Sequence, residues 1–146
     1  GKYVSGALGD VADVDQSDVE TVDVRQFENV KAYLSSHRPD IVVHLAAIQG
    51  RTTSREDPFE FFRVNTLGTL NMLEASRQLG IGKLVFMSSL TVHGMSDIPL
   101  DECSPVRPVH PYGASKAAAE AYVQAYSKSF GIDAIILRPN FICGYF

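Results

Sequence analysis

Short apolar segments alternate along this chain with segments of helical pattern, and that alternation limits its fold more than any other feature. Ile41–Ala46 and Lys83–Ser88 are short, largely apolar runs, which are typical of strands in a parallel sheet that is covered on both faces. A helical pattern over Pro58–Leu79 lies between them. Parallel strands need a crossover connection, which is usually a helix. The sequence therefore predicts an α/β protein with a doubly wound parallel sheet.

The remaining predicted elements continue the same alternation. Strands are expected at Lys2–Leu8, Glu20–Val24 and Ala134–Leu137, and helices at Gln26–Ser36 and Pro111–Phe130. The length of 146 residues is enough to bury a real core. We therefore expect residues 1–146 to form one domain.

Charge and cysteine content argue against several classes of protein. The net charge of −4 provides no basic face for nucleic acid. Cys103 and Cys143 suggest no disulfide framework, and His44, His93 and His110 have no metal-ligand spacing with either cysteine. No apolar run approaches the roughly 20 residues of a membrane span, and we expect no signal peptide. We expect a soluble, cytoplasmic protein that binds no metal, nucleic acid or membrane.

A serine at a strand end and a tyrosine–lysine pair form the candidate catalytic site, which consists of Ser89, Tyr112 and Lys116. Ser88 and Ser89 follow the apolar run at Lys83, where a buried strand would reach its polar rim. Tyr112 and Lys116 are four residues apart at the start of the last predicted helix, so their side chains share one face. The Tyr-x-x-x-Lys spacing alone proves little. Its position at a helix start, after a strand that ends in serine, indicates a proton-transfer site.

Two segments extend this interpretation to a family. SSLTVHG and PYGASKAAAE resemble the serine segment and the tyrosine–lysine helix of the extended short-chain dehydrogenase/reductases, specifically the NAD-dependent epimerase/dehydratase family typified by UDP-glucose 4-epimerase. The resemblance extends from about Asp23 to the last residue. It implies a Rossmann-like fold, an NAD cofactor and a sugar or nucleotide-sugar substrate. Tyr112 would be the acid/base, Lys116 would lower its pKa and hold the cofactor ribose, and Ser89 would orient the reacting oxygen.

The same resemblance assigns contacts at the carboxyl ends of the strands, where open parallel sheets bind ligands. Asp23 would face the adenine, and Ala46 and Ala47 would let the dinucleotide pass closely. As alternatives, Asp23 could cap the next helix and the two alanines could be packing residues. The implied cofactor contacts are Asp23, Val24, Leu45, Ala46, Ala47, Asn65, Ser88, Tyr112, Lys116 and Pro139, and the implied substrate contacts are Ser89, Thr91, Tyr112 and Asn140.

Departures from the family pattern bear on the reaction and the substrate. The family's dehydratases carry Asp and Glu directly after the position of Ser89, whereas this chain has Leu90 and Thr91. Dehydration is therefore disfavoured, and oxidation alone or epimerisation remains. The family's Arg-Pro-x-Asn motif reads Arg-Pro-Asn-Phe here, so that Phe141 replaces the asparagine that touches a nucleotide sugar.

The first residues allow two interpretations. VSGALGDVA, residues 4–12, resembles a glycine-rich phosphate turn with Gly6 and Gly9 correctly spaced, but too few residues follow it for a helix and a strand. Alternatively, GKYVSGAL resembles the family's second strand, and the phosphate turn would precede Gly1. We favour the second interpretation. Under either one we expect a fragment, truncated at its first βα unit and without the C-terminal substrate domain, that is inactive by itself.

The sequence also bears on the choice of cofactor and on oligomerisation. No basic residue lies between Lys2 and Arg25 to bind a ribose 2′-phosphate, which favours NAD over NADP. The two long helices, Pro58–Leu79 and Pro111–Phe130, match those through which the family commonly forms homodimers. The rival hypothesis is a truncated or non-catalytic nucleotide-binding module.

Overall fold

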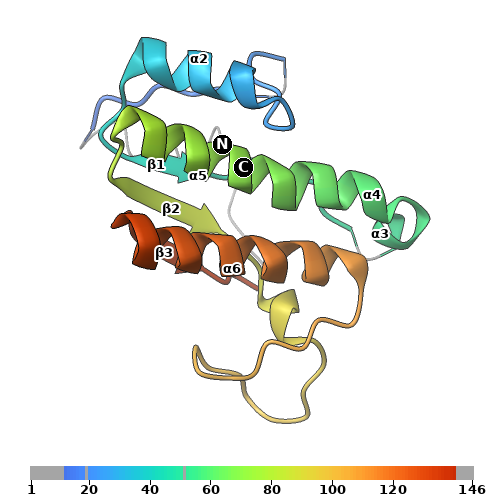
Figure 1. Ribbon diagram of the computed structural model, residues 1–146. Coiled ribbons are helices and arrows are strands. Elements are labelled where there is room, and N and C mark those ends of the chain that lie inside the picture. Colours follow the sequence, from blue (N-terminus) through green and yellow to red (C-terminus); the bar gives the residue numbers. More distant parts are fainter. Residues whose placement is uncertain (1–11, 19, 51, 141–146) are drawn as a thin grey trace.

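The computed structural model describes residues 12–18, 20–50 and 52–140, which form a three-stranded sheet with a layer of helices against it (Figure 1). Strands β1 (Val42–His44), β2 (Lys83–Met87) and β3 (Asp133–Leu137) lie side by side in that order and pair in parallel. In the register, Val43 is paired with Val85, and Val85 with Ile135. The predicted α/β class with a parallel sheet is confirmed.

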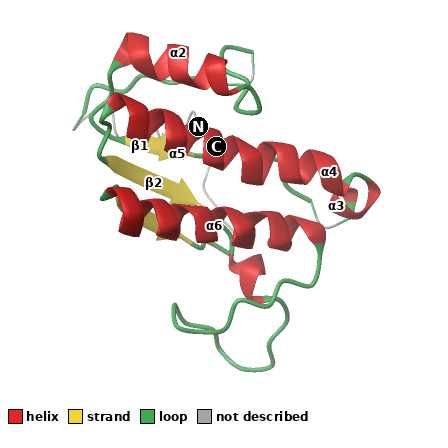
Figure 2. Cartoon of the chain, viewed as in Figure 1, coloured by secondary structure: helices red, strands yellow, loops and turns green. Residues whose placement is uncertain are grey.

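The long helices lie together over the sheet (Figure 2). They are α2 (Phe27–His37), α5 (Gly68–Leu79) and α6 (Pro111–Phe130), and α5 contacts both of the others. Helices α5 and α6 are the crossovers from β1 to β2 and from β2 to β3. Because consecutive right-handed crossovers between strands added in the same direction fall on one face of a sheet, these two helices form a common layer.

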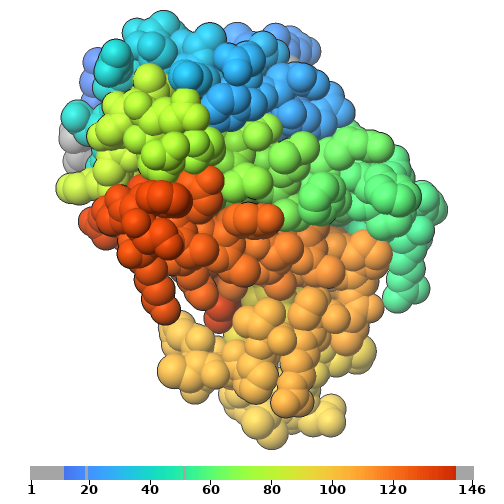
Figure 3. Space-filling view, in the orientation of Figure 1, coloured from blue at the N-terminus to red at the C-terminus, as the bar shows by residue number. Residues whose placement is uncertain are grey.

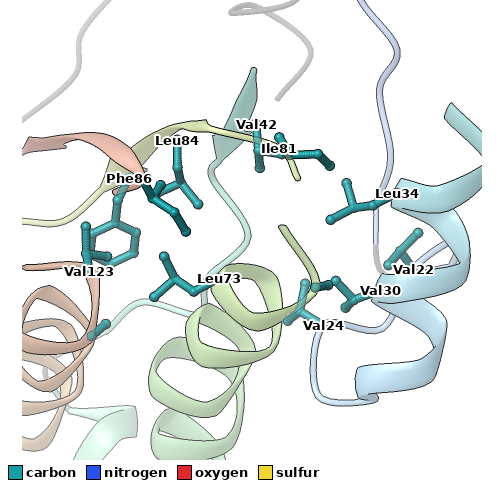
Figure 4. Packing of buried hydrophobic residues seen from close by; sticks show 13 residues of the cluster. Val22, Val24, Val30, Leu34, Val42, Leu73, Ile81, Leu84, Phe86 and Val123 are labelled. Atoms are coloured by element: carbon teal, nitrogen blue, oxygen red, sulfur yellow. The ribbon is translucent and has the colours of Figure 1, made fainter. Parts of the chain in front are cut away.

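The core lies between this helix layer and the sheet (Figure 4). Alternate residues of the strands point into it, such as Leu84 and Phe86, which are almost fully buried. On the opposite face, Val43, Ile135 and Leu137 are 39%, 54% and 42% exposed. The prediction of strands covered on both faces is therefore met on one face only in the described part of the chain. The core residues are Val22, Val24, Val30, Leu34, Val42, Leu73, Ala75, Ile81, Leu84, Phe86, Ala119, Val123 and Ile132.

The strand predicted at Glu20–Val24 is wrong, because a turn takes its place. The Asp18 carboxylate accepts hydrogen bonds from the Glu20 amide at 3.0 Å and from the Thr21 hydroxyl at 3.0 Å. Val22 and Val24 are nevertheless buried in the core. An aspartate that bonds the backbone two residues later stabilises a turn, and here that local bond outweighs the strand preference of the valines.

The helix predicted at Pro58–Leu79 is one continuous helical segment with a widened turn inside it. It consists of α4 (Pro58–Phe61), a π-helical segment η1 (Phe62–Leu67) and α5. Asp57 caps its start by accepting the Glu60 amide at 3.0 Å. Gly80 ends it with φ +73°, a left-handed conformation that glycine adopts at little cost. A short helix α3 (Thr53–Glu56), which was not predicted, precedes it.

Helix α6 has the predicted bounds. Its N-cap is His110, whose Nδ1 accepts the Gly113 amide at 3.0 Å. A 3₁₀ turn, η2 (Leu90–His93), follows β2, and the segment from residue 94 to residue 110 projects from the helix layer (Figure 3). The predicted strand at Lys2–Leu8, the glycine turn at Gly6 and Gly9, and Cys143 lie outside the described residues.

The described residues contain neither a membrane-spanning helix nor a cluster of metal-binding side chains. No helix among them is long and apolar enough to cross a membrane. They contain no group of three or more His, Cys, Asp or Glu side chains that could hold a metal ion.

Candidate active site

The carboxyl ends of β2 and β3 bring several predicted residues to one edge of the sheet. Backbone pairing continues past the strands, because the Ser88 amide donates to the Leu137 carbonyl at 2.8 Å and the Leu90 amide donates to the Pro139 carbonyl at 2.9 Å. The Ser88–Ser89 segment therefore runs alongside the segment from Leu137 to Pro139. This edge is where an open parallel sheet binds its ligand.

Ser89 caps the η2 turn. Its Oγ accepts the Thr91 amide at 3.3 Å and the Thr91 hydroxyl at 3.0 Å. A hydroxyl that accepts two hydrogen bonds still has its own hydrogen to donate, and no described residue accepts it. Ser89 is 8% exposed. Thr91, predicted as a substrate contact, orients the Ser89 hydroxyl in this structure.

The first turn of α6 packs directly against η2. A Cβ atom on Gly113 would lie 2.7 Å from the Thr91 carbonyl oxygen, so only glycine allows this approach. Tyr112 is thereby held beside the turn that Ser89 caps. Its half-buried ring has an edge-to-face contact with Phe61, at 6.1 Å between centroids, and stacks on His110 at 6.0 Å. The structure thus brings the start of α6 and the end of β2 together, as predicted.

Lys116 points from α6 to the end of β2. Its Nζ donates to the Met87 carbonyl at 2.7 Å and lies 4.9 Å from the centroid of the Phe86 ring. Burial lowers the pKa of Lys116 to about 8, and the charge of Glu120 opposes that shift. The predicted tyrosine and lysine are one helical turn apart on α6, and no hydrogen bond joins their side chains in the described residues.

A buried carboxylate that the sequence analysis missed connects these elements. Glu120 is 2% exposed and accepts the Ser88 hydroxyl at 2.5 Å. Both oxygens are also bonded by Arg138, from Nε at 2.9 Å and from Nη2 at 2.7 Å. Glu120 lies four residues after Lys116, on the same helix face. That spacing was the signal available in the sequence, but its partner Arg138 is distant in the chain.

Arg138 also reaches the middle of the projecting segment. Its Nη1 donates to the Glu102 carbonyl at 3.2 Å and lies 3.3 Å from His93 Nε2. Because a guanidinium group only donates hydrogen bonds, His93 Nε2 must be the acceptor. The imidazole hydrogen is then on Nδ1, which lies 3.1 Å from the Pro105 carbonyl oxygen and donates to it.

Asn65, predicted as a cofactor contact, is bonded to other parts of the chain in this structure. Its side chain is completely buried in η1, where Oδ1 accepts the Ile48 amide at 2.9 Å and Nδ2 donates to the Ile48 carbonyl and the Ser115 hydroxyl, both at 3.0 Å. These bonds use both amide hydrogens. Asn65 therefore links the segment after β1 to α6, and its side chain has no donor left for a cofactor.

Asp23 is part of an ion-pair cluster beside η1. The Arg25 guanidinium donates to Asp23 at 2.8 Å and to Glu60 at 2.6 Å. The hydrogen bond from Arg25 holds the pKa of Asp23 below its ordinary value. Asp23 does not cap α2, whose N-cap is Gln26. Its carboxylate is still partly exposed, so it can accept further hydrogen bonds.

The other predicted contacts differ in exposure. Ala46 and Ala47 are exposed after β1, whereas Leu45 and Pro139 are half-buried. Val24 is buried, and its carbonyl accepts Asn71 Nδ2 at 2.9 Å. Asn140 is exposed at the end of the described chain.

The parallel sheet, its crossover helices and its likeness to solved structures place the chain in the Rossmann-like class of α/β proteins. Within that class, the model of the NAD dependent epimerase/dehydratase family matches residues 4–146, and the chain belongs to this family.

Individual relatives show how much of such proteins this chain represents. It is 33% identical over 121 residues to the UDP-glucose 4-epimerase of Rhizobium meliloti strain 1021, covering 82% of this chain and 37% of that protein. It is 37% identical over 116 residues to the dTDP-D-glucose 4,6-dehydratase of Mus musculus, covering 79% and 33%. The crystal structure of the Thermus thermophilus UDP-glucose 4-epimerase in complex with NAD aligns with a TM-score of 0.75 at 42% identity, over 80% of this chain and 39% of that one.

Proposed function

We propose that the protein containing this chain is an NAD-dependent epimerase, or a related oxidoreductase, that acts on a nucleotide sugar. The observation that carries the proposal is the buried Lys116 ammonium, held on the Met87 carbonyl at the end of β2 and one helical turn from Tyr112. Burial of a charged lysine destabilises a fold, and such groups are concentrated at functional sites. The family supports the same chemistry.

The proposed roles follow from what an alcohol loses on oxidation, which is a hydride from its carbon and a proton from its oxygen. The chemistry supplied by bound NAD would be acceptance of the hydride and its later return. The alcohol must also lose its proton, and the Tyr112 hydroxyl is the proposed acid/base. The positive charge of Lys116 would favour the Tyr112 phenolate. Ser89, whose hydroxyl accepts two bonds from Thr91, would donate its own hydrogen to the reacting oxygen.

The residues around η2 favour oxidation or epimerisation over elimination of water. Elimination needs a group that protonates the departing hydroxyl. Leu90 and Thr91 follow Ser89 in η2, and the nearby Glu120 carboxylate is fully engaged by Arg138 and Ser88. Return of hydride to the opposite face of the oxidised carbon, which is epimerisation, needs no further acid.

Features of the described chain fit a dinucleotide without a 2′-phosphate. Ala46 and Ala47 present small exposed side chains at the carboxyl edge, where a ligand can approach the backbone closely. Arg25 is the nearest guanidinium to the predicted adenine residue Asp23, and it is already bonded to Asp23 and Glu60. A 2′-phosphate would have to compete with both carboxylates. We therefore expect the intact protein to bind NAD more tightly than NADP in a fluorescence titration, and tighter binding of NADP would contradict this.

The decisive experiment is Tyr112→Phe in the intact protein. Loss of the phenol hydroxyl should lower kcat by roughly 10²–10⁴-fold, because proton transfer is lost, and should leave NAD binding nearly unchanged. Tyr122→Phe is the matched control, since Tyr122 is on the exposed face of the same helix, 41% exposed. Turnover of Tyr112→Phe within threefold of the unaltered protein would refute the proposal.

A further inference from the structure

The Glu120–Arg138 ion pair joins three elements at the candidate active site. Glu120 belongs to α6, and Arg138 directly follows β3. The Ser88 hydroxyl, directly after β2, donates to the same carboxylate. Glu120 is 2% exposed, and its two oxygens together accept three hydrogen bonds from Ser88 and Arg138. The pair therefore determines how the ends of two strands sit against one helix.

Each attachment point of the pair is close to a proposed catalytic residue. Ser88 precedes Ser89, and Met87, whose carbonyl accepts Lys116 Nζ, precedes Ser88. Glu120 is one helical turn after Lys116. A shift of the β2 end relative to α6 would change the Lys116 position and the distance from Ser89 to Tyr112 together.

The pair also holds the start and the middle of the segment that leads to Tyr112. Arg138 bonds the Glu102 carbonyl and His93, and His93 bonds the Pro105 carbonyl. Arg107, a little further on, donates its amide to the Val92 carbonyl at 2.9 Å. Arg138 therefore holds the segment from η2 to the start of α6 at its start and at its middle.

We propose that Glu120 and Arg138 are positioning residues, which fix the ends of β2 and β3 against α6 and so set the geometry among Ser89, Tyr112 and Lys116. This inference rests on the proposed function of those three residues. The negative charge of Glu120 has a second effect, because it keeps Lys116 protonated at a higher pH than burial alone would allow.

Arg138→Lys tests the proposal in the intact protein. Lysine keeps the positive charge but cannot form the bidentate hydrogen bonds that arginine makes to a carboxylate. Displacing catalytic groups by about 1 Å can cost on the order of 10²-fold in rate. We expect kcat for the nucleotide sugar to fall by roughly 10- to 100-fold, with KM within about threefold. Arg77→Lys is the matched control, because Arg77 forms the same bidentate pair of hydrogen bonds with Glu74. Nε donates to Oε2 at 2.8 Å, and Nη2 donates to Oε1 at 2.6 Å.

A second readout does not depend on turnover. In protein labelled with ¹³C at the lysine Cε, the Lys116 signal should titrate at a lower pH in Glu120→Gln than in the unaltered protein, because a nearby negative charge is lost. The groups facing this ammonium are Glu120 on α6 and His44 on β1. An unchanged Lys116 titration in a folded Glu120→Gln protein would overturn the electrostatic effect.

The outcomes separate this inference from the proposed function. If Tyr112→Phe retains turnover, the proposed function fails, and the Lys116 titration still tests the Glu120 effect. If Tyr112→Phe loses turnover and Arg138→Lys keeps it, the positioning role alone fails. Should either single variant not fold, the double variant Glu120→Leu with Arg138→Met removes both charges together, which buried pairs often tolerate. Full activity of that folded double variant would show that the pair is structural only.

Discussion

At the scale of single residues, Lys116 is a charged group that the fold buries almost completely, with the Met87 carbonyl as its acceptor. Its pKa is about 8 in the folded chain, below the ordinary value of 10.5. Below pH 8 both folded and unfolded chains carry the proton, and the cost of burying the charge applies in full. Between pH 8 and 10.5 the unfolded chain binds more protons, so stability rises with pH. Above 10.5 the cost has disappeared.

Lys116→Met should therefore change the pH dependence of stability. The stability of the unaltered protein relative to this variant should increase by about 3 kcal/mol between pH 7 and pH 10.5, since one pKa unit corresponds to about 1.4 kcal/mol. Urea unfolding of both proteins at several pH values measures the difference. A difference that stays constant, or that falls with pH, would show that the ammonium is not buried in this way.

Gly113 makes a steric demand at the same scale. A methyl group there would lie 2.7 Å from the Thr91 carbonyl oxygen, which is backbone and cannot rotate away. Gly113→Ala should destabilise the protein by about 1–3 kcal/mol despite the better helix propensity of alanine. Gly82→Ala is the control, because nothing lies within 4 Å of the Cβ it would add. Thermal unfolding should show a lower Tm only for the first variant.

At the scale of secondary-structure elements, the π-helical segment η1 places Asn65 between two parts of the chain. Asn65 bonds Ile48 after β1 and Ser115 in α6. Asn65→Ala should destabilise the protein by about 1–3 kcal/mol, because it leaves buried partners unpaired. Asn29→Ala, at an exposed position of α2, should change stability little. Equal urea midpoints for the two variants would contradict the linking role.

Elements whose ends depend on local chemistry were predictable from the sequence. The bounds of α6 follow from Pro111 in its first turn and Gly131 after its last, where φ is +73°. Contacts between residues that are far apart in the chain were not predictable. The π turn at η1 keeps an ordinary helical pattern of apolar residues. Local chemistry did not always suffice either, because the turn stabilised by Asp18 outweighs the strand preference of the valines at Glu20–Val24.

The residues of the candidate site show the same difference between local signals and contacts that are distant in the chain. Ser89, Tyr112 and Lys116 could be proposed from the sequence because the strand end, the helix start and the helical spacing are visible in it. Glu120 and Arg138 could not be paired, since they are in different elements and no spacing rule joins them. The bonds of Asn65 to Ile48 and Ser115 could not be predicted, because the depth of its burial depends on how α6 packs on η1.

At the scale of the whole molecule, the outer surface of the helix layer has features of an interface. Phe59 and Phe62 are 70% and 53% exposed, and Tyr122 is 41% exposed. On α6 the exposed positions near Tyr122 are largely alanines, namely Ala114, Ala118, Ala121 and Ala125. Small residues allow close approach of a second helix. We expect the intact protein to form a homodimer through this surface.

Ala118→Glu combined with Tyr122→Glu should dissociate that dimer, because two charges would be buried at its centre. Sedimentation velocity at micromolar concentration would show a change from dimer to monomer. Ala32→Glu, at an exposed position of α2, should leave the mass unchanged. An intact protein that is monomeric before any substitution would disprove the expectation.

The order of the strands also affects how the chain folds during synthesis. β1, β2 and β3 are neighbours in the sheet in the same order in which they leave the ribosome. Each new strand, with its helix, can therefore dock on an edge that already exists. In this part of the sheet no strand has to wait for a later segment to be inserted between it and its neighbour. Parallel sheets fold slowly when their contacts are distant in the chain. In this order each strand pairs with the strand of the next βα unit. Nascent chains can therefore acquire their core step by step.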